Sequence, residues 1–150
     1  MKRIFISLIA ITVLAFVSVE ASAQCKNFAK KSKVDLLPFI HDGIYNATVL
    51  AEGESAELYK TFYSGQEYRI MVVADEGVPP VDFQIMDSKR KVLYNSKDNN
   101  GAKKWDFILE SSQQLIISLQ VQTSENVKDD ISKGCVAVLI GFMNEENKLR

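Results

Sequence analysis

The sequence predicts an all-β domain, specifically a two-sheet antiparallel β-sandwich of jelly-roll-like form with about eight strands, preceded by a cleaved signal helix. Apolar and polar side chains alternate along most of the chain, which is the period of a half-buried strand. Turn-forming residues separate these segments, and no long amphipathic helical pattern lies between them. A parallel α/β sheet is therefore not expected, while a closed barrel stays open as the alternative.

The first residues have the three zones of a secretory signal. Lys2 and Arg3 supply a positive end, and residues 4–19 form a mostly apolar run. The small residues 21–23 then give the spacing that a signal peptidase accepts. We expect residues 1–23 to be a cleaved signal peptide, which places the protein in the periplasm, at the cell surface or outside the cell.

Two other interpretations of this segment are disfavoured. A permanent anchor helix would need about 20 apolar residues, and this run is shorter. A lipoprotein would need a small residue just before the cysteine, and Gln24 precedes Cys25 instead. After cleavage we expect no membrane span, a sandwich domain at residues 24–143 and a polar tail at 144–150.

The two cysteines, Cys25 and Cys135, agree with export. An even pair in an oxidising compartment most simply forms a disulfide. Such a bond would close a loop of about 110 residues and stabilise the fold by about 4–5 kcal/mol. A reactive thiol is the alternative, but no CxxC motif is present and the only histidine, His41, is remote in the sequence.

The individual strands follow from the alternation. In residues 115–121, for example, Leu115, Ile117 and Leu119 share one face, while Gln120 lies on the other. Residues 25–33 are polar and basic, compatible with one helical turn or with an extended arm. The expected strands are 48–50, 56–63, 68–73, 81–86, 92–94, 105–110, 115–122 and 136–142, with turns at 52–54, 64–66, 87–90 and 98–101 and a proline crossover at 77–80.

Part of this pattern resembles a known fold family. The strand, glycine turn and aromatic-bearing strand of residues 52–70, continued in 81–85, look like the front half of a bacterial pre-peptidase C-terminal-type β-sandwich. In that family the domain is an appendage of a protease, whereas here it would be free-standing. The resemblance implies a sandwich fold and no particular function.

A second resemblance covers nearly the whole chain after the signal. Residues 25–31 (CKNFAKK), 62–66 (FYSGQ) and 134–139 (GCVAVL) are similar to segments of small exported proteins of Bacteroidetes. That group carries no known activity, so the resemblance implies export and says nothing of a reaction.

Composition and motifs argue against several classes of function. The net charge is −1 and no basic stripe is present, so nucleic-acid binding is not expected. One histidine and two bonded cysteines cannot supply an ordinary zinc site. The sequence has no GxSxG elbow and no GxGxxG loop, and we interpret His41 and Asp42 as a hydrogen-bonded turn. No cofactor is predicted.

One weak cation site deserves mention. Asp98 and Asn100 offer oxygen ligands in a tight turn that ends at Gly101. A calcium loop usually has several more carboxylates at fixed spacing, and Lys97 flanks this one. Plain turn chemistry is the preferred interpretation.

The remaining candidates are side chains on the outward phase of the strands. Tyr59, Tyr63 and Met86 are the weak candidates for a ligand or partner surface, because outward tyrosines can stack on sugars or form a protein interface. We therefore expect an exported, non-enzymatic binding or accessory domain of the cell envelope, with a protein or glycan as partner. The alternatives are a structural subunit of an envelope assembly and, less favoured, a glycan-acting hydrolase with dispersed carboxylates.

Overall fold

The computed structural model describes residues 17–123 and 132–144. Most of the predicted signal peptide and the tail 145–150 lie outside this range. Among the described residues no helix is long and apolar enough to cross a membrane. The elements are α2 (Val17–Ser32), η1 (Lys33–Leu36), β1 (Ile40–His41), β2 (Asn46–Ala51), β3 (Ser55–Phe62), β4 (Glu67–Ala74), β5 (Val81–Asp87), β6 (Val92–Asn95), η2 (Lys97–Asn99), β7 (Lys104–Ile108), β8 (Gln113–Val121) and β9 (Lys133–Phe142).

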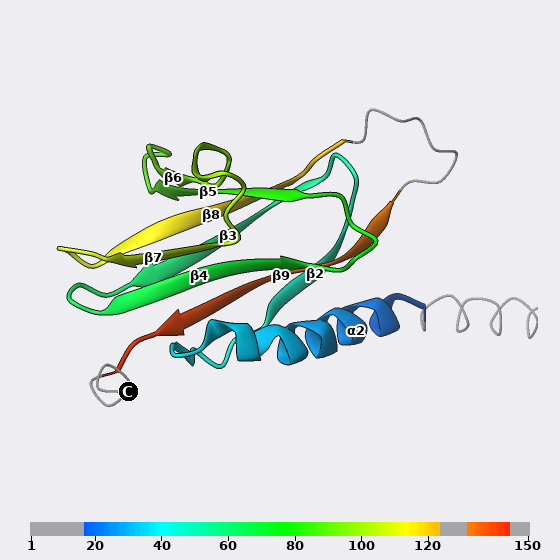
Figure 1. The fold of residues 1–150 in the computed structure, drawn as a ribbon, viewed down its shortest axis with the longest axis horizontal. Coiled ribbons are helices and arrows are strands. Elements are labelled where there is room, and N and C mark those ends of the chain that lie inside the picture. Colours follow the sequence, from blue (N-terminus) through cyan, green and yellow to red (C-terminus); the bar gives the residue numbers. More distant parts are fainter. Residues whose placement is uncertain (1–16, 124–131, 145–150) are drawn as a thin grey trace, which may run out of the picture.

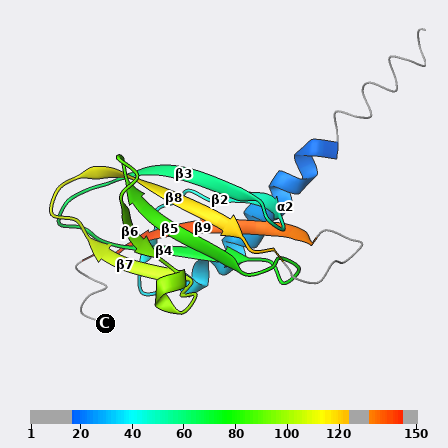
Figure 2. The ribbon, with the colours of Figure 1, turned by 90° about the horizontal axis from the view of Figure 1, so that it is seen from above.

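The strands form two antiparallel sheets that pack face to face, as Figures 1 and 2 show. The five-stranded sheet has the order β1-β9-β4-β7, with β2 also paired to β9. The four-stranded sheet has the order β3-β8-β5-β6. The predicted sandwich is thus confirmed, and the barrel alternative is rejected because the strands divide into two separate sheets.

The core lies between the two sheets and is built by the predicted alternation. On β8, Leu115, Ile117, Leu119 and Val121 all belong to this core. The main exception to the alternation is Lys60, whose ammonium group reaches Asp42 at 2.8 Å. Lys60 lies on β3, which is an edge strand, and an inward charge at a sheet edge discourages pairing with other chains.

The helix α2 is the main departure from the predicted architecture. Residues 25–32 belong to a 16-residue helix, where the sequence pattern had suggested one turn or an extended arm. Figure 1 shows that α2 lies against the outer face of the five-stranded sheet, along β2 and β9. Cys25 and Ala29, one helical turn apart, are both fully buried there, and small side chains let helix and sheet approach closely.

The predicted disulfide is present. Cys25 of α2 and Cys135 of β9 are joined by an S–S bond of 2.03 Å, with their Cα atoms 5.1 Å apart. Ala29, Leu36, Met71, Ala137 and Leu139 form a second buried cluster beneath the helix. The disulfide therefore fastens α2 to the sheet face on which it packs.

His41 belongs to a strand, which corrects the prediction that it lies in a turn before the first strand. It pairs with Gly141 of β9 in the short strand β1. The turn follows immediately, because the Nδ1 of His41 accepts the Gly43 N–H and the Asp42 carboxylate accepts the Ile44 N–H. Gly141 is required here, since an added Cβ would lie 2.8 Å from the Cβ of Phe39.

Candidate functional site

The outer face of the four-stranded sheet carries an apolar row that crosses all four strands. The register places Tyr59 of β3 opposite Ile116 of β8, and Ile116 opposite Met86 of β5. Met86 in turn pairs with Val92 of β6, at a β-bulge. Two of the predicted surface residues, Tyr59 and Met86, thus lie in one cross-strand row on the same face.

A polar bridge lies across this row. Arg90, in the turn between β5 and β6, donates to both carboxylate oxygens of Glu57 on β3, at 2.8 and 2.9 Å. The Tyr59 hydroxyl also donates to Glu57, at 2.9 Å. The hydrogen bond from Arg90 is the largest cause that lowers the pKa of Glu57 below its ordinary value, so the carboxylate stays charged and the bridge stays intact near neutral pH.

The bridge spans the part of the row that is hidden. Because β8 lies between β3 and β5, the Arg90 side chain has to cross the outer face of β8 to reach Glu57. Ile116 and Met86 point outward, yet only 3% and 8% of their surfaces are exposed, while Tyr59 is 51% exposed. The sequence pattern identified the outward phase of Met86, but it did not indicate that the Arg90 side chain crosses this face.

Arg90, which forms the ion pair with Glu57, has an unusual backbone conformation. Its φ angle is 63°, in the left-handed region where glycine and asparagine are the ordinary occupants. The turn is supported by the Asp87 side chain, which accepts the backbone N–H groups of Lys89 and Lys91. The strained position directs the Arg90 side chain back over the sheet, which no sequence motif would have indicated.

Tyr63 is not part of the row. It follows the end of β3 and is exposed, and its backbone N–H donates to the Tyr68 hydroxyl at 3.3 Å. The turn beyond it is held by the connection between β7 and β8, since the Ser64 N–H donates to the Ser112 hydroxyl and the Gly65 N–H to the Leu109 carbonyl. Tyr63 therefore lies at one end of the sandwich, on a turn that is held in place.

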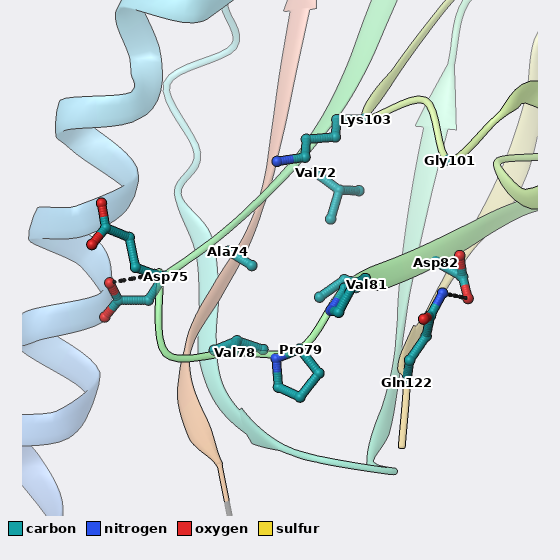
Figure 3. A pocket seen from close by; sticks show the side chains of 12 residues that line it. Val72, Ala74, Asp75, Val78, Pro79, Val81, Asp82, Gly101, Lys103 and Gln122 are labelled. Atoms are coloured by element: carbon teal, nitrogen blue, oxygen red, sulfur yellow. Dashed lines mark hydrogen bonds between the residues drawn. The ribbon is translucent and has the colours of Figure 1, made fainter. Parts of the chain in front are cut away.

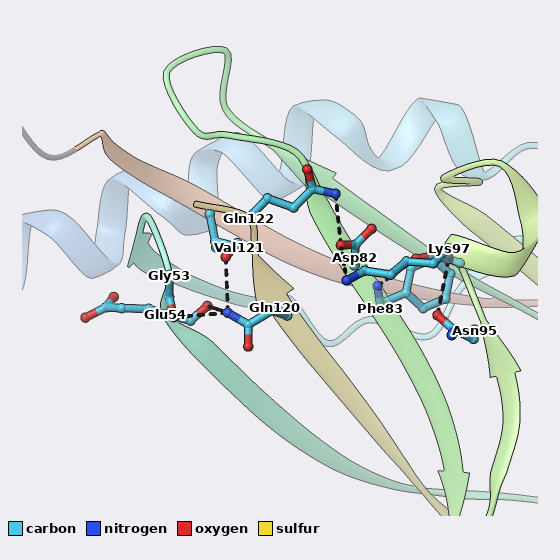
Figure 4. Close-up of polar contacts among 10 residues, drawn as sticks. Gly53, Glu54, Asp82, Phe83, Asn95, Lys97, Gln120, Val121 and Gln122 are labelled. Carbon is cyan, nitrogen blue, oxygen red and sulfur yellow. Dashed lines mark hydrogen bonds and ion pairs between the residues drawn. The ribbon is translucent and has the colours of Figure 1, made fainter. Parts of the chain in front are cut away.

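The far end of the same face is polar. Asp82 of β5 is only 6% exposed, and its carboxylate accepts from the Gln122 amide at 2.9 Å and pairs with the Lys97 ammonium at 3.3 Å (Figure 4). The Gln120 amide donates to the Gly53 and Glu54 carbonyls. These contacts tie the β2–β3 turn and η2 to the sheet, and they satisfy the buried acid without a ligand.

A pocket of about 390 Å³ opens beside Asp82, where the crossover of residues 75–80 meets β5 (Figure 3). Its walls are largely apolar, from Val72, Val78 and Val81. Two of its three acids are engaged, because Asp75 accepts the Glu76 N–H and Asp82 is held by Lys97 and Gln122. The Glu76 and Lys103 side chains also line the pocket.

The cation candidates lie in the segment between β6 and β7. Asp98 is part of the single 3₁₀ turn η2, and Asn100 follows it with a left-handed φ of 56°. Within residues 17–123 and 132–144, no cluster of three or more histidine, cysteine or acidic side chains could hold a metal ion. Turn chemistry stays the preferred interpretation of both residues.

Solved structures of other proteins are similar to about two thirds of this chain. One is PliG of Aeromonas hydrophila, a periplasmic inhibitor of g-type lysozyme, with a TM-score of 0.50 and 8% identity over 67% of this chain and 85% of that protein. Another is PliG of Salmonella Typhimurium, also a periplasmic inhibitor of g-type lysozyme, with a TM-score of 0.41 and 18% identity over 67% and 86% of the two chains. No protein-family model matches the sequence. No curated protein matches it either.

These likenesses concern the fold. The chain is an antiparallel β-sandwich with a disulfide-fastened helix on one sheet and an open face on the other. The resemblances to pre-peptidase C-terminal-type domains and to small exported Bacteroidetes proteins stay predictions.

Proposed function

We propose that the chain is an exported, non-enzymatic binding protein that recognises a partner protein of the cell envelope through the outer face of its four-stranded sheet. The observation that carries the proposal is the difference between the two outer faces. One is covered by α2, whereas no helix or strand of the described residues lies over the four-stranded sheet (Figure 2), and its row of Tyr59, Ile116, Met86 and Val92 is spanned only by the Arg90–Glu57 ion pair.

The chemistry of the open face suits protein recognition. Tyrosine and arginine dominate the energetic centres of protein interfaces, and here Tyr59 and Arg90 lie next to each other around an apolar strip. The face is built on paired strands, so the partner meets a rigid surface that needs little ordering. The disulfide and the predicted signal peptide support an oxidising compartment outside the cytoplasm.

Enzymes that cleave envelope glycans are the first partner class to test. Lysozyme inhibitors with this architecture, at low identity, motivate the choice, and the fold alone does not decide it. A lysozyme is itself a folded protein, which agrees with a rigid face as the recognition surface.

The test has two arms. The purified protein is mixed with a panel of lysozymes, including a g-type enzyme, and cell-wall lysis is measured. In parallel it is crosslinked in envelope extracts and its partners are identified. We expect one stoichiometric partner, lost when Tyr59→Ala removes the exposed aromatic ring and retained in a matched Tyr63→Ala variant at the sandwich end.

Two outcomes would reject the proposal. The first is a partner that binds the Tyr59→Ala and parent proteins equally. The second is capture of only further copies of this chain, with self-association in ultracentrifugation, which would favour the structural-subunit alternative.

A further inference from the structure

A second surface lies at the carboxyl end of α2, away from the open face of the four-stranded sheet. Here α2, η1 and β1 surround an open groove of about 470 Å³, within the size range of small-molecule sites. It is lined by Lys30, Lys31, Lys33, Val34, Leu37, Phe39, Ile40 and His41.

The apolar part of the groove projects outward. Val34 and Leu37 are 62% and 67% exposed, and Ile40 stands beside them at the edge of the sheet. Phe39 is buried below, where the Arg69 guanidinium lies 4.2 Å from its ring centroid. Because these aliphatic side chains project from a rigid base, they lose little further conformational entropy on binding. They gain free energy when they move from water into an apolar phase.

The charged part of the groove has one sign. Lys31 and Lys33 form no ion pair with any residue of the described chain. Neither neighbouring acid lines the groove: Asp42 pairs with Lys60 and has its Oδ1 3.8 Å from the His41 Nε2, and Asp35 lines a separate groove. His41 adds no positive charge near neutral pH, because burial lowers its pKa.

We infer that this groove docks the protein on an anionic membrane leaflet, with Val34, Leu37 and Ile40 inserted at the level of the acyl chains and the lysines at the acidic headgroups. Exposed aliphatics ringed by uncompensated lysines complement such a surface in both polarity and charge. The groove is open, so a single amphiphile lying in it would leave much of its tail in water, whereas a leaflet covers the projecting side chains.

The inference is independent of the proposed partner face, because the two surfaces share no residue. In co-sedimentation with phosphatidylglycerol vesicles at low salt, the purified protein should bind, and phosphatidylcholine vesicles or high salt should release it. A Lys31→Gln/Lys33→Gln variant should bind about 25-fold more weakly, since each lysine near an anionic surface contributes about fivefold. A Leu37→Gln variant should also bind more weakly.

Matched controls separate this groove from general stickiness. Lys103→Gln/Lys104→Gln removes two exposed lysines elsewhere, and Val49→Gln replaces another exposed aliphatic residue. Both controls should bind as the parent does, and circular dichroism should show that all variants are folded. Every variant has the same N-terminus, so any membrane affinity of that segment cancels in the comparison.

Three results would overturn the inference. One is equal binding to the anionic and the uncharged vesicles, and another is equal loss in the groove variants and the controls. The third is binding of monomeric dodecanoate, below its micelle concentration, without any binding of anionic vesicles, which would assign the groove to a free amphiphile.

Discussion

The two outer sheet faces of this sandwich bury apolar side chains to a similar extent by different means. On the five-stranded sheet, Met71 and Leu139 lie beneath α2, which is packed and covalently fastened. On the four-stranded sheet, Ile116 and Met86 are buried on the outer face that the Arg90–Glu57 ion pair spans, and we expect the Arg90 side chain to be their cover. The exposed fraction of a side chain therefore does not show how firmly that side chain is covered. Exposing Met71 and Leu139 would require α2 to detach from the sheet. Exposing Ile116 and Met86 would require only one side chain to rotate, which suits the proposed recognition surface.

The largest expected effect comes from releasing the covalent fastening. A Cys25→Ser/Cys135→Ser variant frees a link of sequence separation 110, which the chain-entropy model values at about 4–5 kcal/mol of unfolding free energy. We expect urea unfolding to show this loss. The helical circular dichroism should disappear at lower urea than the fluorescence change of Trp105, which reports the sandwich core. A loss below about 1 kcal/mol would show that packing alone holds α2.

Sequence alternation predicted most of the sandwich because half-buried strands repeat every two residues, as in residues 115–121. It missed α2 as a cover because residues 25–33 are mostly polar, and the fully buried side chains among residues 23–32 are the small Cys25 and Ala29. It found Tyr59 and Met86 on one face, since register follows from alternation. It could not find Arg90, because a side chain that crosses a neighbouring strand leaves no local pattern.

Two truncations compare the covers directly. Leu139→Ala leaves a cavity sealed beneath the helix and should lower the unfolding free energy by about 3 kcal/mol. Ile116→Ala leaves a hollow under a movable side chain, which water and Arg90 can fill, so about 1.5 kcal/mol is expected. Chemical denaturation of both variants measures the difference. Equal losses would mean that the Arg90 bridge seals the row as firmly as the helix does.

The next effect is a dependence of stability on pH that arises at His41. Its side chain is 1% exposed, and burial is the largest cause that lowers its pKa below 6.5, aided by Lys33 and Lys60 and opposed by Asp42. The unfolded chain therefore binds the proton more readily. The stabilisation is present above about pH 6.5 and is lost as the pH falls toward the folded-state pKa, by at most about 1.4 kcal/mol per pH unit.

The measurement is the urea stability of the parent and of His41→Gln between pH 5 and 7.5. Titration of the carboxylates is common to both proteins and cancels. The parent should lose more stability on acidification than the variant, whose glutamine can still accept the Gly43 N–H. Parallel pH profiles would show that His41 becomes charged in the fold as easily as in the unfolded chain.

The smallest effect on stability, and the most direct test of the comparison, is removal of the bridge. Arg90→Gln breaks an exposed ion pair, and such pairs contribute little to stability, so the melting temperature should hardly change. Met86 should nevertheless react several-fold faster with peroxide, because oxidation of methionine follows its exposure. Met71, beneath α2, is an internal reference in the same molecule. Peptide mass spectrometry gives the ratio of the two sulfoxides.

Acid should reproduce the same change without a mutation. Arg90 lowers the pKa of Glu57 below its ordinary 4.5, so the bridge holds at higher pH and is lost as the pH falls through the folded-state pKa. The Met86-to-Met71 oxidation ratio should then rise in acid in the parent and stay flat in Arg90→Gln. If the Met86-to-Met71 oxidation ratio is unchanged both in Arg90→Gln and in acid, a group other than Arg90 covers the row. The outer face of the four-stranded sheet would then be covered as firmly as the face beneath α2, and the proposal that it is the recognition surface would be rejected.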